Sequence, residues 1–412
     1  MNSDRAKNTE NKIFCILPWV HMQLRQTGDA YPCCRVSEKH SYGSTRTESI
    51  DQIWNSENIK KIRTDMLDGK PQKFCTDCYN LEKIGDYSYR QMANDEFADS
   101  KNTVISTKNI VAKKSDLQFL DLRFSNICNF KCRSCNPDSS SSWHDDYQKV
   151  YPNWIADEKI LKIEKWAPDI LNQIESQLPF LQKIYFAGGE PLIDKNHYLI
   201  LEKLIEIGRT DILLSYNTNM SHIKHKKWDC LRLWSNFKNV QISASIDAIG
   251  KPLELIRKGA NWDVIWKNIF SVKLFCPWIK FNIYPTISIM NIFNLTQTIQ
   301  FFIDKKIILN SGNIKLNLLN DPDYLNVNIL TAAEKNVVIS NLRIYLDQLK
   351  NSCDLDLYEH LKKEFLILNN FLYPDLSHLR PAFRKYTFTL DKSRTEKTAQ
   401  VIPELFSLLY ES

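Results

Sequence analysis

Residues 125–135 read SNICNFKCRSC, which places Cys128, Cys132 and Cys135 in a CX3CX2C spacing. Three thiols this close in the chain can all ligate one small inorganic cluster. A [4Fe-4S] cluster held by three thiolates keeps one iron open to an outside ligand, whereas a structural zinc site usually has four protein ligands. The spacing therefore predicts a metal cluster with one reactive position.

A second motif, Gly188-Gly189-Glu190-Pro191, directly follows the apolar stretch 183–187. Two adjacent glycines let the backbone approach a ligand closely, and the carboxylate of Glu190 can pair with a cation. A Gly-Gly turn is common by itself, so this GGEP turn gains its weight from the cysteine triplet that precedes it.

Together, the cysteine triplet and the GGEP turn resemble the radical S-adenosylmethionine (SAM) superfamily. The resemblance implies a partial (β/α)6 barrel whose three cysteines hold a [4Fe-4S] cluster, with the open iron chelating the methionine moiety of SAM. It also implies that the GGEP turn binds SAM, with the backbone and the acid holding the methionine ammonium. The alternative interpretation is a zinc site or an incidental group of thiols.

The composition favours a soluble, cytoplasmic enzyme. The 412 residues are enough for more than one domain, residues 1–12 lack the apolar core of a secretory signal, and no apolar run approaches the thickness of a bilayer. Eleven cysteines in such a chain more often serve metals or catalysis than disulfides. The net charge of +6 comes from basic residues interspersed with acids, so we expect neither nucleic acid nor a membrane as a partner.

From residue 115 onward, strand-like and helical stretches alternate, which predicts an α/β fold with a parallel sheet. The expected strands are 117–124, 183–187, 212–216, 240–246, 281–289 and 314–319. Both motifs follow carboxyl ends of expected strands, where barrel enzymes carry their chemistry.

The expected organisation has four parts. Residues 1–94 form an auxiliary-cluster domain, 95–114 a linker, 115–325 the (β/α)6 barrel, and 326–412 a mainly helical C-terminal extension with amphipathic helices over 331–350 and 356–372.

Polar residues at the ends of later strands resemble further SAM contacts of the family. Asn217 and Asn219 follow the third strand, in the segment that lies near the SAM ribose in relatives. Ser245 and Asp247 end the fourth strand and resemble the Ser-x-Asp segment beside the cofactor. An Asn-rich turn and a helix N-cap are the alternative interpretations of these two segments.

Two more residues resemble cofactor contacts with less specificity. Arg257 matches an arginine that reaches the SAM carboxylate in some relatives, and an exposed position is its alternative. Asn291 follows the fifth strand and is placed to bond adenine or ribose, with a plain loop role as its alternative.

A second group of cysteines precedes the expected barrel. Cys33 follows Gly28 in a GX4C spacing, Cys75 and Cys78 form a CX2C pair, and Cys15 lies upstream of them all. Four thiols in a small domain are expected to stabilise it through their metal, because its own core is small.

This pattern resembles the twitch domain, the shortened form of the SPASM domain, which binds an auxiliary [4Fe-4S] cluster in radical SAM enzymes. The resemblance implies Cys15, Cys33, Cys75 and Cys78 as ligands. Such domains mostly follow the barrel, whereas these cysteines precede it. A closed tetrathiolate zinc site and a ligand role for Cys34 in place of Cys33 both stay open.

The stretches 53–57, 66–71, 135–140 and 388–394 resemble a group called twitch domain-containing radical SAM proteins, which has no single agreed reaction. The family resemblance implies reductive cleavage of SAM to a 5′-deoxyadenosyl radical that abstracts a hydrogen from substrate. A fully ligated auxiliary cluster is expected to accept the substrate's electron, which predicts a net oxidation.

We expect a small-molecule or peptide substrate and an electron donor such as flavodoxin or ferredoxin. A peptide- or protein-maturing enzyme that forms a crosslink or an epimer is one alternative. A zinc-stabilised binding or scaffold protein is the non-enzymatic one. The sequence assigns no catalytic side chain.

Overall fold

The computed structural model describes residues 12–83, 85, 87–155 and 158–411, so the N-terminal segment expected to lack a signal lies outside it except for Lys12. The chain divides into two compact units. The first comprises Met1–Ser125, Lys162–Phe186 and Leu199–Leu213, and the second Asn126–Leu161, Ala187–Tyr198 and Leu214–Ser412.

The sheet of the first unit joins the cysteine-rich N-terminal region to two barrel strands. Its strands are β1 (His21–Leu24), β2 (Asp29–Tyr31), β3 (Gly43–Ser44), β4 (Phe119–Leu122) and β6 (Lys183–Phe186), in the order β6-β4-β1-β2-β3. β1 pairs in parallel with β4, which pairs in parallel with β6, whereas β2 and β3 extend the sheet antiparallel. The N-terminal hairpin is therefore part of the same sheet as the first barrel strands.

Short helices complete the first unit. They are α1 (Leu17–Val20), α2 (Ile50–Trp54), α3 (Glu57–Leu67), α4 (Thr76–Lys83), α5 (Tyr89–Glu96), α6 (Ala98–Thr107), α8 (Ile163–Trp166), α9 (Ile170–Glu175) and most of α10 (Lys195–Glu206). The predicted linker 95–114 thus contains a helix of its own, α6.

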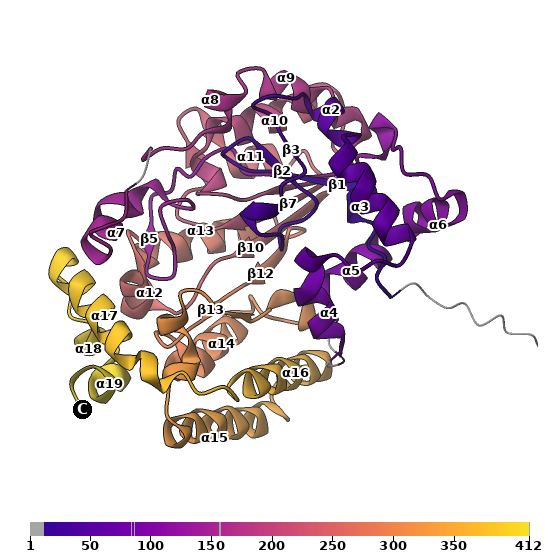
Figure 1. The fold of residues 1–412 in the computed structure, drawn as a ribbon. Coiled ribbons are helices and arrows are strands. Elements are labelled where there is room, and N and C mark those ends of the chain that lie inside the picture. The colour runs from indigo at the N-terminus through magenta and orange to yellow at the C-terminus, as the bar shows by residue number, and fades with distance from the viewer. Residues whose placement is uncertain (1–11, 84, 86, 156–157, 412) are drawn as a thin grey trace, which may run out of the picture. The chain divides into compact units, whose positions relative to one another are not determined.

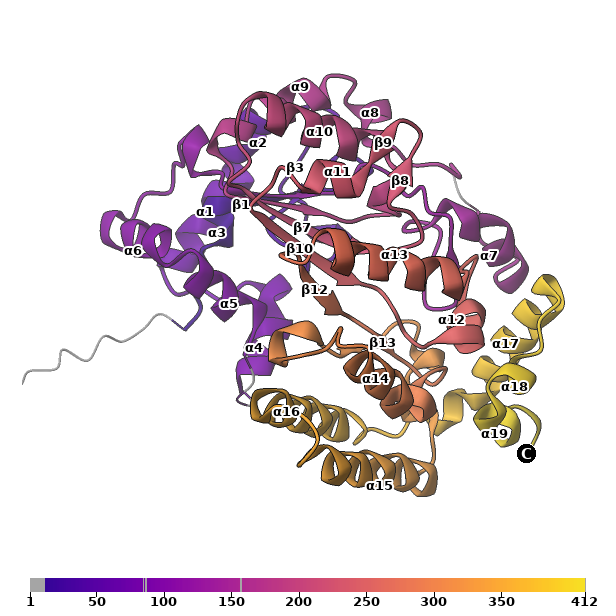
Figure 2. The ribbon, with the colours of Figure 1, turned by 180° about the vertical axis from the view of Figure 1, so that it is seen from behind.

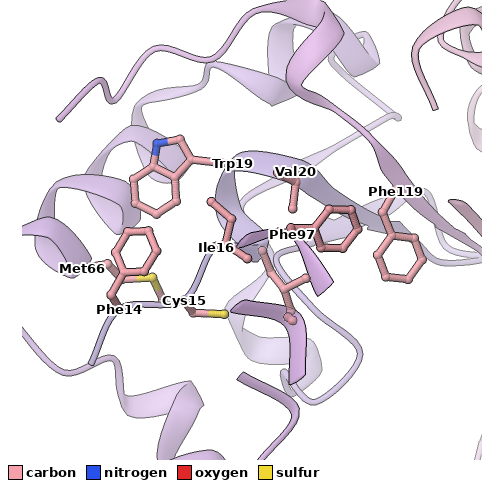
Figure 3. Close-up of a cluster of buried hydrophobic side chains, with 10 residues drawn as sticks. Phe14, Cys15, Ile16, Trp19, Val20, Met66, Phe97 and Phe119 are labelled. Atoms are coloured by element: carbon pink, nitrogen blue, oxygen red, sulfur yellow. The ribbon is translucent and has the colours of Figure 1, made fainter. Parts of the chain in front are cut away.

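Aromatic and aliphatic side chains from α1, β4 and the helices form a core in the first unit, shown in Figure 3. Phe14 stacks on Trp19 with ring centroids 5.2 Å apart. Cys15 lies among these side chains and is itself buried (Figure 3). The core therefore fixes the position of one predicted cluster ligand.

Arg63 of α3 ties this unit together from a fully buried position. Its guanidinium donates hydrogen bonds to the carbonyl oxygens of Pro18 (2.9 Å), Trp54 (3.0 Å) and Ile110 (3.0 Å) and to Oδ1 of Asn55 (3.1 Å). These oxygens come from three segments of the chain, around residues 18, 54–55 and 110, so one buried cation joins all three.

We expect Arg63→Met to lower the free energy of unfolding by about 3 kcal/mol, because the buried oxygens lose their charged donor. Urea unfolding followed by circular dichroism measures the change. The control is Lys61→Met on the same helix, whose side chain is 77% exposed and makes a surface pair with Asp65. That control should stay within about 0.5 kcal/mol of the parent. Equal stabilities for the two variants would contradict the role of Arg63.

The second unit holds the remaining strands. β7 (Leu213–Thr218), β10 (Asn239–Ala244) and β12 (Lys280–Ile283) follow one another in the order β12-β10-β7, with β10 and β12 parallel. β13 (Thr286–Ile287) pairs in parallel with β14 (Asn317–Leu318). β5 (Lys131–Cys132) pairs antiparallel with β11 (Arg257–Lys258), and β8 (Lys224–His225) with β9 (Trp228–Asp229).

Helices surround these strands and build the C-terminal region of the second unit (Figures 1 and 2). The longer ones are α7 (His144–Val150), α12 (Gly250–Ile256), α13 (Trp262–Phe275), α14 (Leu295–Asp304), α15 (Ala332–Leu349), α16 (Leu355–Phe371) and α17 (Arg380–Arg394). α11 (Cys230–Trp234), α18 (Thr398–Val401) and α19 (Phe406–Tyr410) are short. α15 packs against α16, and α17 lies beside α7 (Figures 1 and 2).

The predicted α/β class is confirmed, and all six strands expected for the (β/α)6 barrel form. The strand expected over 281–289 is divided into β12 and β13, because Pro285 lies between them and has no N–H for the ladder. The last expected strand is only two residues long, as β14. Both predicted C-terminal helices exist as α15 and α16. Within the described ranges, no helix combines the length and apolarity needed to cross a bilayer.

Candidate functional site

The three thiols of the CX3CX2C loop lie in the second unit, where β5 carries Cys132 at the middle of the loop. The backbone N–H of Phe130 donates to Sγ of Cys128 at 3.4 Å, and Nη1 of Arg257 donates to Sγ of Cys132 at 3.6 Å. The hydroxyl of Ser142 donates to the Cys128 carbonyl at 2.6 Å. Donors aimed at sulfur suit thiolates, so the loop is prepared to hold charged ligands.

Burial raises the pKa of all three thiols, that of Cys135 to about 12. Arg257 lowers the pKa of Cys132 against that trend. Thiols with raised pKa values are neutral at pH 7, and a bound metal is what deprotonates them. Three neighbouring soft donors fit a cluster with one open iron.

The GGEP turn lies against the loop that precedes Cys128. A Cβ on Gly189 would stand 2.1 Å from the carbonyl oxygen of Ile127, and Gly188 has φ +110°. The N–H of Glu190 donates to that same Ile127 carbonyl at 2.8 Å. Gly189 is thus required by the close packing and Gly188 by its positive φ, before any ligand is considered.

Glu190 is 3% exposed, and three protein groups donate to its carboxylate. They are the N–H of Leu192 (3.0 Å), the hydroxyl of Thr218 (2.7 Å) and the N–H of Asn219 (2.7 Å). Burial nevertheless raises the pKa of Glu190 to about 7, against the lowering effect of these bonds. The carboxylate is therefore fixed in place and poised between its charged and neutral forms near pH 7.

The structure distinguishes the two Asn residues predicted after the third strand. Asn217 is still within β7 and is exposed, whereas Asn219 is buried. Asn219 bonds Glu190 through its N–H and bonds Oδ1 of Asn129 through Nδ2 at 3.0 Å. Asn219 thus links the GGEP turn to the cysteine loop.

Ser245 and Asp247 follow the end of β10, and Arg257 of β11 pairs with Asp247. The N–H of Ser245 donates to the Thr218 carbonyl at 2.9 Å. Nη2 of Arg257 donates to Oδ1 of Asp247 at 2.9 Å, and both side chains are buried, so the alternative of an exposed arginine is wrong. This ion pair holds the guanidinium against Cys132.

The side chain of Asn291 is used by the loop around it. Nδ2 donates to the carbonyls of Asp247 (2.9 Å) and Thr286 (3.0 Å), and Oδ1 accepts from the N–H of Ser288 (2.8 Å). These bonds favour the loop role, and its SAM contact stays a prediction.

Two residues of this site were absent from the sequence-based set. Thr218 holds Glu190, and Asn129 joins Asn219 while its Nδ2 donates to the hydroxyl of Ser221 at 3.0 Å. Both residues lie inside motifs that the sequence analysis recognised. The sequence pattern does not show that Thr218 contacts Glu190 or that Asn129 contacts Asn219.

The four other predicted ligands lie in the first unit and line one pocket. The pocket is bordered by Cys15, Cys33, Cys75 and Cys78 together with Arg35 and Arg90. Arg90 is held by Glu82 through Nε (2.8 Å) and Nη2 (2.6 Å). Four thiols facing one space, with cations beside them, suit an anionic cluster ligated by protein alone.

Cys34 faces elsewhere. Its main charge interactions are with Asp121 and Arg123, and it also interacts with Arg35, whereas Cys33 interacts with Cys34 and with the pocket thiols of Cys15 and Cys75. Cys34 does not line the pocket. The geometry therefore favours Cys33 as the ligand.

Burial raises the pKa of all four pocket thiols, that of Cys75 to about 12. Metal binding would have to deprotonate them, as in the cysteine loop. In the part of the chain that the structure describes, no three His, Cys, Asp or Glu side chains are gathered tightly enough for a single metal ion.

Comparison with protein families matches both cysteine regions. The model of the SPASM iron-sulfur cluster-binding domain matches residues 15–79, and that of the radical SAM superfamily matches residues 122–275. The chain is a radical SAM protein with a SPASM domain. Its cofactors are accordingly SAM and iron-sulfur clusters. The two matches fall inside the predicted ranges 1–94 and 115–325, whose boundaries themselves stay predictions.

Solved structures with similarity to this radical SAM protein include anSMEcpe with bound AdoMet, at 18% identity over 57% of this chain and 59% of that one, with a TM-score of 0.41. SuiB of Streptococcus suis bound to its precursor peptide SuiA is 16% identical over 82% of this chain and 71% of that one, with a TM-score of 0.38. The chain thus spans 59% of the length of the first of them. No curated protein matches at a significant level.

We expect Gly189→Ala to lower SAM cleavage about 100-fold, because the new methyl group forces the GGEP turn and the Cys128 loop apart by about 1 Å. Formation of 5′-deoxyadenosine with dithionite measures the loss. Gly250→Ala is the control: it also changes a glycine of the second unit, at φ +62°, but its Cβ meets nothing within 4 Å. It should cost about 1 kcal/mol of stability and retain cleavage. Normal cleavage by Gly189→Ala would contradict the proposed close contact.

Proposed function

We propose that this radical SAM protein cleaves SAM reductively at the Cys128-Cys132-Cys135 loop and oxidises a substrate with the help of a SPASM cluster on Cys15, Cys33, Cys75 and Cys78. The observation that carries the proposal is the difference between the two thiol sets. Three thiols leave a position for SAM, whereas four thiols around one pocket close the ligand shell.

When bound, the loop cluster supplies the electron that breaks SAM into methionine and a 5′-deoxyadenosyl radical. The protein's residues hold the reactants. Glu190 pairs with the methionine ammonium, since its carboxylate is fixed by Thr218 and Asn219. Arg257, locked by Asp247, donates to the Cys132 sulfur and keeps positive charge beside the anionic cluster.

The four-thiol pocket supports an oxidative outcome. A cluster whose irons all carry protein thiolates has no free position for substrate, so electron acceptance is its suitable role. Hydrogen abstraction followed by loss of one electron gives a net two-electron oxidation of the substrate. Formation of a crosslink in a peptide fits this scheme, whereas epimerisation is redox-neutral and would not need the SPASM cluster.

The loop cluster also needs an outside one-electron donor, for which flavodoxin or ferredoxin is proposed. A groove of about 450 Å³ runs beside the cysteine loop and is lined by Asn129, Lys131 and Lys258 among others. It supports an approach of the donor to this side of the loop. The substrate is proposed to be a small molecule or a peptide.

We expect SAM to bind Glu190→Gln more weakly by about 1.5 to 3 kcal/mol, because the amide lacks the charge that pairs with the ammonium. In the parent protein, a proton on Glu190 competes with that ammonium. SAM affinity should therefore fall as pH drops below about 7, by up to about tenfold per pH unit. Equilibrium binding from pH 6 to 8 measures both effects. The glutamine variant should show little pH dependence, and a parallel pH curve would refute the assignment.

We expect about eight irons per chain after anaerobic reconstitution, four for each cluster. Replacing Cys128, Cys132 and Cys135 by Ala should remove one cluster and all SAM cleavage. Cys75→Ala with Cys78→Ala should remove the other cluster and keep SAM cleavage, but lose the oxidised product. Iron and sulfide analysis, 5′-deoxyadenosine formation and mass spectrometry of products from cell extract are the measurements.

Two single variants test the ligand choice within the SPASM domain. Cys34→Ala should keep both clusters, whereas Cys33→Ala should lose the auxiliary one. Stoichiometric zinc in the SPASM pocket would overturn the auxiliary-cluster half of the proposal. Full oxidation by the Cys75, Cys78 double variant would instead show that the auxiliary cluster is structural and does not accept the substrate's electron.

A further inference from the structure

The backbone around Cys132 is held from outside the SAM site by side chains distant in sequence. Nε1 of Trp143 donates to the Cys132 carbonyl at 2.5 Å, and the hydroxyl of Tyr386 donates to the Arg133 carbonyl. The N–H of Arg133 donates to the Ile256 carbonyl at 2.7 Å. Tyr386 belongs to α17, so a C-terminal helix contacts the middle of the cysteine loop.

The side chain of Arg133 strengthens this connection. It is fully buried, and its Nη2 donates to Oδ1 of Asp391 at 2.6 Å and to Oε2 of Glu396 at 2.8 Å. Its Nε and Nη1 are buried with no hydrogen-bond partner in the described part of the chain. The two acids at the end of α17 are therefore what compensates the charge of this cation.

The same region holds both strands of the ribbon that carries Cys132. Glu396 also pairs with Lys258 of β11 at 2.9 Å. Asp146 of α7 pairs with Lys131 of β5 at 2.7 Å and accepts from Nε of Arg394 at 2.9 Å. Each strand of the β5/β11 ribbon is thus tied by an acid that also binds a buried arginine.

The turn after α17 brings Glu396 into position. Thr395 adopts φ +55°, a conformation that is costly for a β-branched residue. The N–H of Glu396 donates to the Asp391 carbonyl at 2.9 Å, and Thr398 donates to the Asp391 carboxylate through its N–H (2.8 Å) and hydroxyl (2.7 Å). Asp391 thus holds both the side chain of Arg133 and the turn after α17.

We propose that the end of α17 and the turn after it, residues 386–398, act as a clamp that positions the loop of the SAM cluster. Tyr386, Asp391 and Glu396 are positioning residues that act through Arg133 on the backbone of Cys132. The inference rests on the proposed function, because it assumes that this loop holds a cluster. It makes retention of that cluster depend on the C-terminal segment.

The test compares the parent protein with a double variant that carries both Asp391→Asn and Glu396→Gln. Removing both carboxylates leaves Arg133 buried without a counter-charge, so the ribbon should loosen around Cys132. We expect the SAM cluster to lose iron to a chelator about 10- to 100-fold faster, with the SPASM cluster unchanged. Iron loss followed by absorbance, electron paramagnetic resonance of each reduced cluster, and the SAM cluster's midpoint potential are the readouts. The uncompensated positive charge should shift that potential upward.

Three further variants make the result specific. Glu404→Gln changes an exposed acid of the same C-terminal region and should behave as the parent. Tyr386→Phe, which removes one hydroxyl, should accelerate iron loss in the same direction but less. Arg133→Met alone removes the link between the two acids and the loop, so it should accelerate iron loss about as much as the double variant does.

Selective loss of the SAM cluster from both the double variant and Arg133→Met supports the clamp. Unchanged iron loss, or equal loss of both clusters, overturns it. A parent protein that never binds the loop cluster overturns the proposed function as well, whereas a parent with both clusters and an insensitive double variant overturns the clamp alone.

Discussion

The contact between Gly189 and the carbonyl of Ile127 is the constraint on which the candidate SAM site depends. It leaves no room for a side chain, and the N–H of Glu190 bonds the same oxygen. The segment before Cys128, the first proposed cluster ligand, and the segment that carries Glu190, the acid proposed to bind the ammonium, are therefore held together through the backbone. The relative placement of the proposed cluster and SAM sites thus does not rely on flexible side chains.

The buried charges around the cysteine loop are also fixed by specific contacts. Three groups of buried charges near the loop are paired within the protein: Arg257 with Asp247, Arg133 with Asp391 and Glu396, and Asp146 with Arg394. An anionic cluster would add charge to a region that is already balanced pair by pair. Such a balance makes the site sensitive to the loss of one partner rather than to the net charge of the protein.

Much of this could be predicted from local sequence. The strands were recognisable because buried parallel strands are short apolar runs, and the two motifs lie where those strands end. The break at Pro285 was missed, because the apolar run 281–289 was taken as one strand although proline has no N–H for a central ladder. The partnership of Arg133 with Asp391 joins residues 258 positions apart, and the parallel pairing of β1 with β4 is also non-local. Pattern reasoning has no access to such contacts, because each segment looks ordinary alone.

The parallel pairing of β1 with β4 has a consequence for the solubility of the first unit. β4 pairs with β6 along one edge. Without the N-terminal hairpin, the backbone of its four buried residues would be unpaired along the other edge. β1 occupies that side, and β2 and β3 then reduce the outer edge to two residues. A short edge offers little template for another chain. The cysteine-rich segment therefore protects the sheet against intermolecular strand pairing. This protection does not depend on a metal bound by the segment.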